Sequence, residues 1–326
     1  MTTKSDNFGY LKYFEPSRYV GRLRTLSKKW QKHFDKKRLN LVYQGFRNSS
    51  GFDKRIPSPN EMALYSGSFA AARSLKEFST AFSKEACLNE LPELLKIAKY
   101  EEGQKTLNLF DYGCGLGRLA YAFTNYFGKS ENFQYCGYEI LPQAVRFLKS
   151  AYEDYPNVTI LNDKILFEKS YIEIEYPDPQ SKKDGRVEPK SLSLADRCRN
   201  VFNIQYSHSV FTHMDRGDIV QVLKNFNSSF ISGVCVNTWL IIDRFAESSL
   251  RAGLADRDLP YEVDGYLTYD QHNPLLCSAY RLKDIEKIYE EAGHEILNIF
   301  FGSWSGRIPQ QKFSTQDVIV SRPIRS

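Results

Sequence analysis

The residues of this chain that could do chemistry begin with a glycine-rich stretch, Leu109–Ala120, which reads LFDYGCGLGRLA. Gly113, Gly115 and Gly117 stand at alternate positions just behind Asp111. Glycines allow a tight turn and leave the main chain bare, so a ligand can lie directly on backbone N–H groups near a helix N-terminus. The stretch therefore predicts a ligand site at the carboxyl ends of parallel strands.

Neighbouring residues supply the strand and the helix that such a loop needs. Leu107, Leu109 and Phe110 predict a short apolar strand broken by Asp111, and Arg118–Phe127 have the pattern of a helix buried on one side. A nicotinamide-binding fingerprint would place the third glycine one residue later. A P-loop would continue with Gly-Lys-Ser/Thr, where this chain has Arg-Leu. The spacing therefore favours neither of these two ligands.

An acid, one further residue and then G-x-G-x-G is a pattern that resembles motif I of the class I S-adenosylmethionine-dependent methyltransferases. The resemblance implies S-adenosylmethionine as the cofactor and makes Asp111 and the three glycines cofactor-binding residues. In that family the amino end of the methionine moiety lies over this loop. An ammonium group suits the nearby acid better than a pyrophosphate does. A purely structural turn is the alternative for the loop taken alone.

A second acid stands at the end of the next predicted strand. Gln134–Glu139 reads QYCGYE, and Glu139 follows Gly117 by 22 residues. A carboxylate at that place can accept hydrogen bonds from both hydroxyls of a ribose. The alternative is an acid that merely ends a strand at the surface. The resemblance places the next residue, Ile140, against the adenine.

A third predicted strand, Val158–Leu161, is followed directly by Asn162 and Asp163. In the family this position carries polar side chains near the adenine amine, which implies a cofactor contact for both residues. A plain turn accounts for the pair almost as well.

After a fourth predicted strand, Val201–Tyr206, the chain continues SHSVFTHMD. This segment resembles the Ser-Val-Phe-Thr-His-Leu sequence found after strand four in a bacterial subgroup of the same methyltransferases. Many members of that subgroup are associated with sugar and surface-polysaccharide pathways. In that subgroup the end of strand four faces the methyl group, which makes Ser207, His208 and Ser209 candidates for the methyl-transfer site and Ser207 a cofactor contact. Either His208 or His213 is the candidate general base. A structural role is the alternative for each histidine.

Residues 243–280 leave the minimal fold and contain several tyrosines and aspartates and a histidine. Aromatic faces beside groups that bind hydroxyls are typical of a saccharide site, although the same residues could simply pack a lid. Tyr269 and His272 are candidate acceptor-binding residues. Further on, the segment GSWSGR resembles one common in the same methyltransferase subgroup, and its Arg307 either lines the acceptor pocket or closes the sheet edge. We expect Trp304 of that segment to pack rather than to bind.

The order of these elements predicts an α/β, Rossmann-like fold. It fits the seven-stranded sheet of the family, in which the last strand is antiparallel, with helices on both faces. We expect the methyltransferase domain over residues 61–326, with an insertion at about 164–200 and a lid-like insertion at about 243–280. Residues 164–200 either cover the substrate or decorate the surface.

Residues 1–60 form a basic N-terminal arm, with 14 Lys and Arg against four Asp and Glu in a chain whose formal net charge is +5. Apolar residues recur in it at spacings of three and four, which predicts an amphipathic helix. These residues are Val20, Leu23, Leu26, Trp30 and Phe34. The helix either packs on the main domain or docks on an anionic partner such as a phosphorylated carrier or a membrane surface. Nucleic acid is the least supported partner, because no recognised binding motif accompanies the charge.

The composition of the 326 residues, 42% hydrophobic and 25% charged, is that of a soluble globular protein. We expect a cytoplasmic location, because the chain has neither a secretory signal nor an apolar run of the roughly 20 residues that span a membrane. Six scattered cysteines lack zinc-site spacing and predict reduced, mostly buried thiols. No acidic cluster has the spacing of oxygen ligands, so we expect no metal.

Two classes of function follow from these residues. The first is an active methyltransferase that acts on an oxygen of a sugar, a glycan or a related small hydroxylated acceptor, and the intact Asp111, glycines and Glu139 favour it. The second is a binding or scaffold protein that keeps the fold without turnover. Among enzymes, N-methylation of a small molecule or a protein is the second choice, and a dehydrogenase is the third because of the glycine spacing. The sequence does not indicate the oligomeric state.

Overall fold

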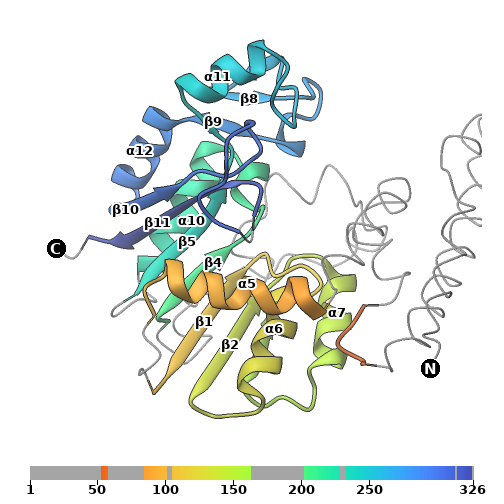
Figure 1. The fold of residues 1–326 in the computed structure, drawn as a ribbon. Helices are drawn as coiled ribbons and strands as arrows, with labels where there is room; N and C mark the ends of the chain where they lie inside the picture. The colour runs from red at the N-terminus through yellow and green to blue at the C-terminus, as the bar shows by residue number, and fades with distance from the viewer. Residues whose placement is uncertain are drawn as a thin grey trace, which may run out of the picture. The chain divides into compact units, whose positions relative to one another are not determined.

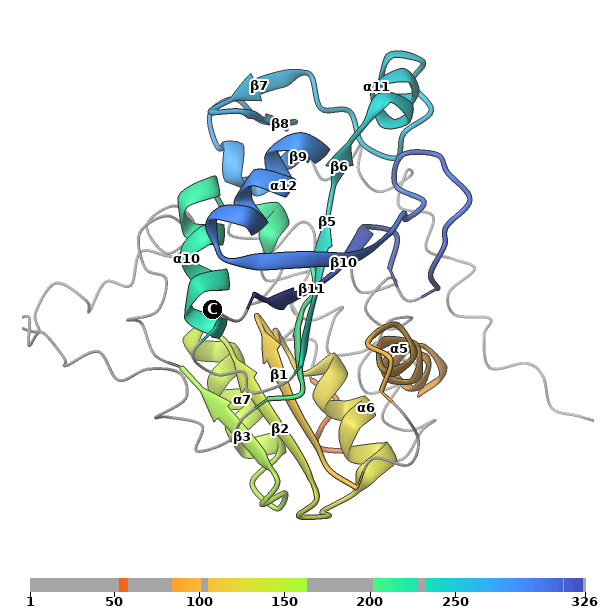
Figure 2. The same cartoon turned by 90° about the vertical axis from the view of Figure 1, so that its left-hand side faces the viewer.

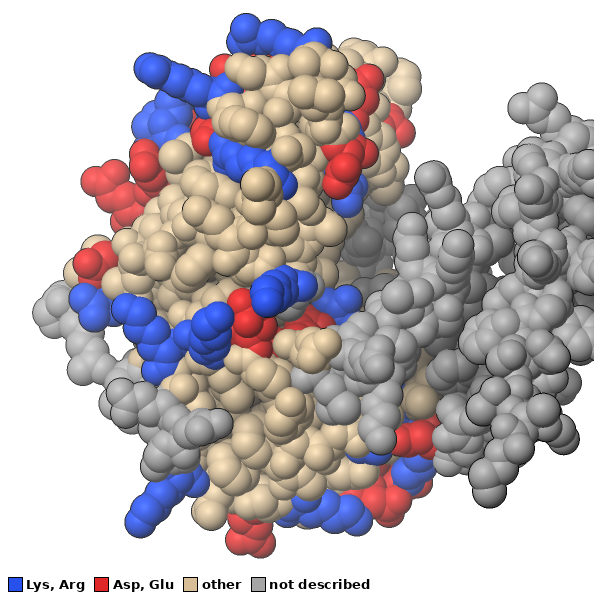
Figure 3. All heavy atoms as spheres, in the orientation of Figure 1, with Lys and Arg blue, Asp and Glu red and all other residues tan. Residues whose placement is uncertain are grey.

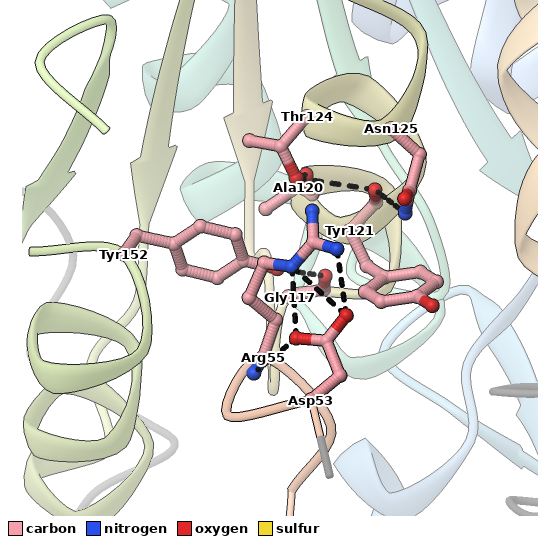
Figure 4. Close-up of polar contacts among 8 residues, drawn as sticks. All are labelled: Asp53, Arg55, Gly117, Ala120, Tyr121, Thr124, Asn125 and Tyr152. Carbon is pink, nitrogen blue, oxygen red and sulfur yellow. Dashed lines mark hydrogen bonds and ion pairs between the residues drawn. The ribbon is translucent and has the colours of Figure 1, made fainter. Parts of the chain in front are cut away.

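The chain divides into two compact units, Met1–Phe78 and Ser79–Ser326. The computed structural model describes residues 53–57, 84–100 (side chains from 89), 105–162, 202–227, 233–312 and 314–324. The basic arm, apart from 53–57, and the insertion at about 164–200 therefore lie outside the described residues. In the first unit, Asp53 accepts hydrogen bonds from the backbone N–H and the guanidinium of Arg55, as Figure 4 shows.

A seven-stranded sheet forms the frame of the second unit (Figure 1). Its strand order is β10-β11-β5-β4-β1-β2-β3. The strands are β1 (Leu107–Tyr112), β2 (Phe133–Tyr138), β3 (Val158–Leu161), β4 (Ile204–Ser207), β5 (Val234–Trp239), β10 (His294–Phe300) and β11 (Asp317–Pro323). Strands β1 to β5 run parallel, whereas β11 is antiparallel to both of its neighbours, β5 and β10. The predicted sheet, including its antiparallel last strand, is confirmed.

Helices cover both faces of this sheet (Figure 2). They are α5 (Lys84–Ile97), α6 (Arg118–Phe127), α7 (Pro142–Ala151), α10 (Arg216–Asn227) and α12 (Leu282–Glu291). Helices α5 and α6 lie on one face, α10 lies on the opposite face beside α12, and α7 contacts β3. The buried side chains of α6 are mostly apolar, including Leu119, Ala120 and Phe123, and the helix contacts both β2 and α5. Proline at the first position of α7 fits a helix start.

Strand β1 runs two residues further than the apolar pattern predicted. Asp111 does not break it, because the residue lies opposite Gly137 of β2 and Tyr206 of β4 and so has a strand on each side. The strand ends at Tyr112, whose ring stacks on that of Tyr138 with 5.2 Å between centroids. Pairing on both edges therefore overrides the low strand propensity of an acid.

The predicted fifth strand, VCVNTWLIID, is divided between two sheets. Strand β5 ends at Trp239, and the next two-residue strand, β6 (Ile241–Ile242), joins a separate four-stranded sheet of order β6-β9-β8-β7. The rest of that sheet comes from the lid-like insertion: β7 (Tyr261–Val263), β8 (Tyr266–Thr268) and β9 (Ala279–Arg281), with α11 (Arg244–Arg251) beside them. Asp264 and Gly265 link β7 to β8 with φ of +48° and +87°, which is typical of a two-residue hairpin turn.

In the view of Figure 3, an area without charged side chains lies over β10 and β11, between the charges near α5 and those of the second sheet. The four described cysteines are buried free thiols, as predicted. Within the described part of the chain, no helix has both the length and the apolar character needed to cross a bilayer.

Candidate functional site

The glycine loop is a tight turn between β1 and α6. Gly113, Gly115 and Gly117 have φ of +75°, +58° and +80°, in the left-handed region that glycine occupies without strain. The N–H groups of Gly113 and Cys114 both donate to the carbonyl oxygen of Tyr138, at 2.9 and 3.0 Å. This oxygen stands at the end of β2, so the loop is anchored to the neighbouring strand.

The loop also packs closely against two other parts of the chain. A Cβ at Gly113 would lie 2.4 Å from Cγ2 of Val210, in the segment that follows β4. A Cβ at Gly117 would lie 2.6 Å from Cδ2 of Leu148 in α7. The hydroxyl of Tyr152, just after α7, donates to the carbonyl oxygen of Gly117 at 3.3 Å (Figure 4). Close approach therefore adds to the conformational reason for glycine at positions 113 and 117.

Glu139 lies at the end of β2 with its carboxylate turned toward the glycine loop. It is 4% exposed, and its Oε2 accepts a hydrogen bond from the N–H of Gly115 at 2.9 Å. Its Oε1 accepts from the N–H groups of Ile140 and Leu141, at 2.8 and 2.9 Å. Burial raises the pKa of Glu139, and these backbone donors oppose the rise. A carboxylate offers about four acceptor positions, so one position is left after three bonds.

Asp111 lies one strand away, on β1. The hydroxyl of Tyr135 donates to its Oδ2 at 2.6 Å, and the side chain is buried. Burial raises the pKa of Asp111 to about 7, an effect that the Tyr135 hydrogen bond partly opposes. Near neutral pH this carboxyl is therefore poised between its protonated and ionised forms.

The remaining predicted cofactor residues differ in their surroundings. Ile140 is partly buried and packs against the main apolar core. Asn162 follows β3 and is exposed, and Asp163 lies outside the described residues. Ser207, the last residue of β4, is fully buried, and its hydroxyl donates to Oδ1 of Asn237 on β5 at 2.7 Å.

A closed ring of polar groups follows the end of β4. Ser209 has a left-handed backbone, with φ of +57°, and its N–H donates to Oγ1 of Thr238 at 2.7 Å. The Thr238 hydroxyl donates to Oε1 of Gln316 at 2.6 Å, and Nε2 of Gln316 donates to Oγ of Ser209 at 3.0 Å. A left-handed residue other than glycine is strained, and strain of this kind clusters at functional sites.

His208 is held from both sides. An Nη2 of Arg118 lies 3.3 Å from its Nδ1, and Oγ of Ser314 lies 3.2 Å from its Nε2. Burial, together with the charge of Arg118, lowers the pKa of His208 to about 4. The imidazole is therefore neutral at physiological pH.

His213 has a different partner, although it lies only five residues further on. Its Nδ1 is 3.2 Å from the carbonyl oxygen of Leu275. A carbonyl oxygen only accepts, so Nδ1 carries the proton and the lone pair is on Nε2. Burial lowers the pKa of His213.

Comparison with solved structures finds methyltransferases at low identity, whereas no family model matches this chain. The mitomycin 7-O-methyltransferase MmcR is 14% identical, with a TM-score of 0.43, over 94% of this chain and 72% of its own. The S-adenosylmethionine-dependent methyltransferase SibL is 13% identical, with a TM-score of 0.46, over 94% and 73%. The magnesium protoporphyrin IX methyltransferase ChlM from Synechocystis PCC 6803, which has S-adenosylhomocysteine bound, is 13% identical, with a TM-score of 0.43, over 86% and 97%. At such identities the assignment of each site residue depends on the geometry of this chain.

The candidate acceptor residues lie in two places. Tyr269 and His272 are exposed in the turn after β8, where the Tyr269 hydroxyl donates to the Leu276 carbonyl at 3.4 Å. Arg307 lies between β10 and β11, forms an ion pair with Asp243, and has its guanidinium 4.0 Å from the ring centroid of Phe301. Tyr269 and His272 were expected from the composition of residues 243–280 and Arg307 from its segment GSWSGR, and the structure places them in different segments of the chain.

Trp304 packs, as predicted. It is buried, and its indole N–H donates to Oδ2 of Asp317 at 2.6 Å. The other oxygen of Asp317 accepts from the N–H of Gly302 at 2.8 Å. Asp317 therefore holds the start of the segment between β10 and β11 on the end of the sheet.

Several residues that complete the candidate site were not predicted from the sequence. They are Glu90, Arg118, Asn237, Thr238, Ser314 and Gln316. Two signals were present: Arg118 directly follows the last loop glycine, and Asn237 and Thr238 interrupt the apolar strand VCVNTW. No motif contains Glu90, Ser314 or Gln316, so their place in the site follows only from the fold.

Proposed function

We propose that this chain is an S-adenosylmethionine-dependent methyltransferase that acts on an oxygen of a sugar, a glycan or a related small hydroxylated acceptor. One observation carries the proposal: the buried Glu139 carboxylate is joined to the N–H of Gly115 in a left-handed glycine loop at the carboxyl ends of parallel strands. Such an edge is where open α/β sheets bind their ligands.

The described residues fit this cofactor. Glu139 retains an acceptor position for a ribose hydroxyl. Asp111 is a buried carboxyl near the same loop, and its ionised form would balance an ammonium group. We assign the adenine end to Ile140, Asn162 and Asp163, and a further cofactor contact to Ser207.

Bound S-adenosylmethionine would supply an electrophilic methyl group, and transfer is an in-line displacement that consumes a positive charge. The protein's task is chiefly alignment. Removing the proton of an acceptor hydroxyl calls for a base that is unprotonated at the working pH. Of the two histidines predicted for this role, we assign it to His213, because its lone pair is on Nε2 while Nδ1 of His208 faces a guanidinium. Tyr269, His272 and Arg307 stay candidates for acceptor binding.

Calorimetric titration with S-adenosylhomocysteine tests this function, with a nicotinamide dinucleotide as the control ligand. We expect micromolar binding of the former and none of the latter. Binding of the dinucleotide alone, or of neither compound, would overturn the proposal.

A screen of sugars and glycans with radiolabelled methyl donor would then identify the acceptor. On that acceptor, His213→Asn should lower kcat by about 10²- to 10⁴-fold and leave affinity for S-adenosylhomocysteine unchanged. A His213→Asn enzyme with full kcat would exclude this histidine as the base.

A further inference from the structure

Arg118 is the first residue of α6 and directly follows the glycine loop. Its Nε lies 2.5 Å from Oε2 of Glu90 in α5, and its Nη2 lies 2.8 Å from Oε1 of the same carboxylate. The Tyr206 hydroxyl on β4 also donates to that Oε1, at 2.8 Å. Glu90 is 4% exposed, so this ion pair is shielded from water on the carboxylate side.

The charge on Glu90 is retained despite burial. Burial by itself would raise the pKa of this carboxyl, but the charge of Arg118 and the hydrogen bonds from Arg118 and Tyr206 outweigh it, and the pKa is lowered. A two-point, charge-assisted contact fixes the plane of a guanidinium. Arg118 is therefore held in a defined orientation before any ligand is present.

The same guanidinium determines which nitrogen of His208 carries the proton. All nitrogens of an arginine donate and none accepts, so the 3.3 Å contact with Nδ1 of His208 requires the lone pair on Nδ1. The ring proton is then on Nε2, which lies 3.2 Å from Oγ of Ser314. A hydroxyl oxygen can accept that proton.

We propose that Arg118, oriented by Glu90, is a positioning residue that keeps His208 in the Nε2–H tautomer, so that His208 ties the glycine loop to Ser314 in the segment between β10 and β11. The groups that face His208 are consistent with this role. Among the described residues, the charge of Arg118 lowers the His208 pKa and that of Glu90 raises it, and the ring of Tyr206 lies 6.2 Å away at 28°.

This tie has a consequence for the site. Ser314 is two residues from Gln316, which closes the polar ring at the ends of β4 and β5. Ser314 also accepts, through Oγ, from the N–H of Gln316 at 3.0 Å. The glycine loop and the segment between β10 and β11, which also carries the acceptor candidate Arg307, are thus joined through His208. The role of this link in the active site rests on the proposed methyl transfer, whereas the tautomer of His208 does not depend on that function.

Long-range 1H–15N correlation spectra of the full chain, labelled with 15N-histidine and without cofactor, test the proposal. We expect the Nε2–H tautomer for His208 in the wild-type protein. In Arg118→Met we expect a mixture of tautomers and a His208 pKa at least about one unit higher, because the opposing charge is gone. Arg118→Lys keeps a donor and a charge, so it should restore the Nε2–H form.

Two further variants separate Arg118 from other causes. Ser314→Ala should keep the Nε2–H tautomer, because Arg118 imposes it. Arg216→Met breaks an exposed ion pair with Glu291 and should leave the His208 signals unchanged. An Nδ1–H tautomer in the wild-type protein, or an unchanged tautomer in folded Arg118→Met, would overturn the proposal whatever the protein's reaction. Failure of S-adenosylhomocysteine to bind would leave this result intact and would count only against the proposed function.

Discussion

Val210 occupies the space that a side chain at Gly113 would need. A Cβ there would lie 2.4 Å from Cγ2 of Val210, at a residue whose φ is +75°. The glycine loop and the segment after β4 therefore pack closely against each other because Gly113 has no side chain. This contact brings the glycine loop against the stretch that carries His208 and His213.

Gly113→Ala should destabilise the protein through both of these effects. The left-handed backbone costs about 1–2 kcal/mol for a residue with a Cβ, and overpacking adds about 1–3 kcal/mol. Gly253→Ala is the matched control, because its φ is +67° and a Cβ there would meet nothing within 4 Å. Urea unfolding of Gly253→Ala should show the backbone cost without the overpacking cost. Equal losses for the two variants would show that the Val210 contact relaxes freely.

Glu139→Gln should weaken S-adenosylhomocysteine binding. The amide group cannot accept at both ends, so the ribose contact and part of the loop anchor are lost together. One lost charge-assisted bond is worth about 1.5–3 kcal/mol, or roughly a 10- to 150-fold rise in Kd. Calorimetry measures the change, and Glu131→Gln, at an exposed position before β2, serves as control. A folded Glu139→Gln protein with wild-type affinity would remove Glu139 from the ribose site.

Asp111 should make the free energy of unfolding depend on pH. Its pKa is about 7 in the folded protein against an ordinary 3.8, so the folded state keeps a proton that the unfolded chain has lost. The free energy of unfolding therefore falls as pH rises from 3.8 to about 7, by about 1.4 kcal/mol per pH unit at most, and levels off above. His208, whose pKa is lowered, acts in the opposite sense.

The difference between wild type and Asp111→Asn isolates this contribution, since His208 is common to both. An asparagine oxygen can still accept the Tyr135 hydroxyl proton. Urea unfolding from pH 4 to pH 8 should show the two proteins diverging, with wild type losing stability relative to the variant. Parallel pH profiles would mean that Asp111 is ionised throughout that range.

Gln205→Met should stabilise the protein. Gln205 lies on β4 between Phe110 and Cys235, is fully buried, and neither end of its amide has a hydrogen-bond partner in the structure as far as it is described. Methionine has a similar shape and removes an unpaired polar group, which is worth about 1–3 kcal/mol.

Asn157 is the contrasting case for this test. It is also buried, and its Oδ1 has no partner among the described residues, but its two Nδ2 hydrogens face three backbone carbonyl oxygens, of Gly128, Ser130 and Phe133. Asn157→Leu should therefore destabilise the protein in the same urea unfolding experiment. A loss of stability in Gln205→Met would indicate that the Gln205 amide is hydrogen-bonded in the folded protein.

Local sequence patterns predicted the parts of the candidate site that depend on neighbours in the chain. Gly113, Gly115 and Gly117 have the left-handed backbone that their spacing suggested, because a turn of this kind is decided within a few residues. Glu139 was expected just after a strand, and β2 ends at Tyr138. The split of VCVNTWLIID was not predictable, because a short apolar run carries no information about which sheet its residues join.

The sequence by itself determined the order of the strands in the seven-stranded sheet, the glycine turn and Glu139 at the end of β2, because hydrophobic periodicity and glycine conformation act over short distances. Only the tertiary structure decided which ring nitrogen of His208 and of His213 carries the lone pair. Glu90 lies 28 residues before Arg118, His208 lies 90 residues after it, and Ser314 a further 106. Contacts at such separations arise from the sheet order and helix packing. The sequence shows that a residue can donate or accept a hydrogen bond, but only the fold determines its partner.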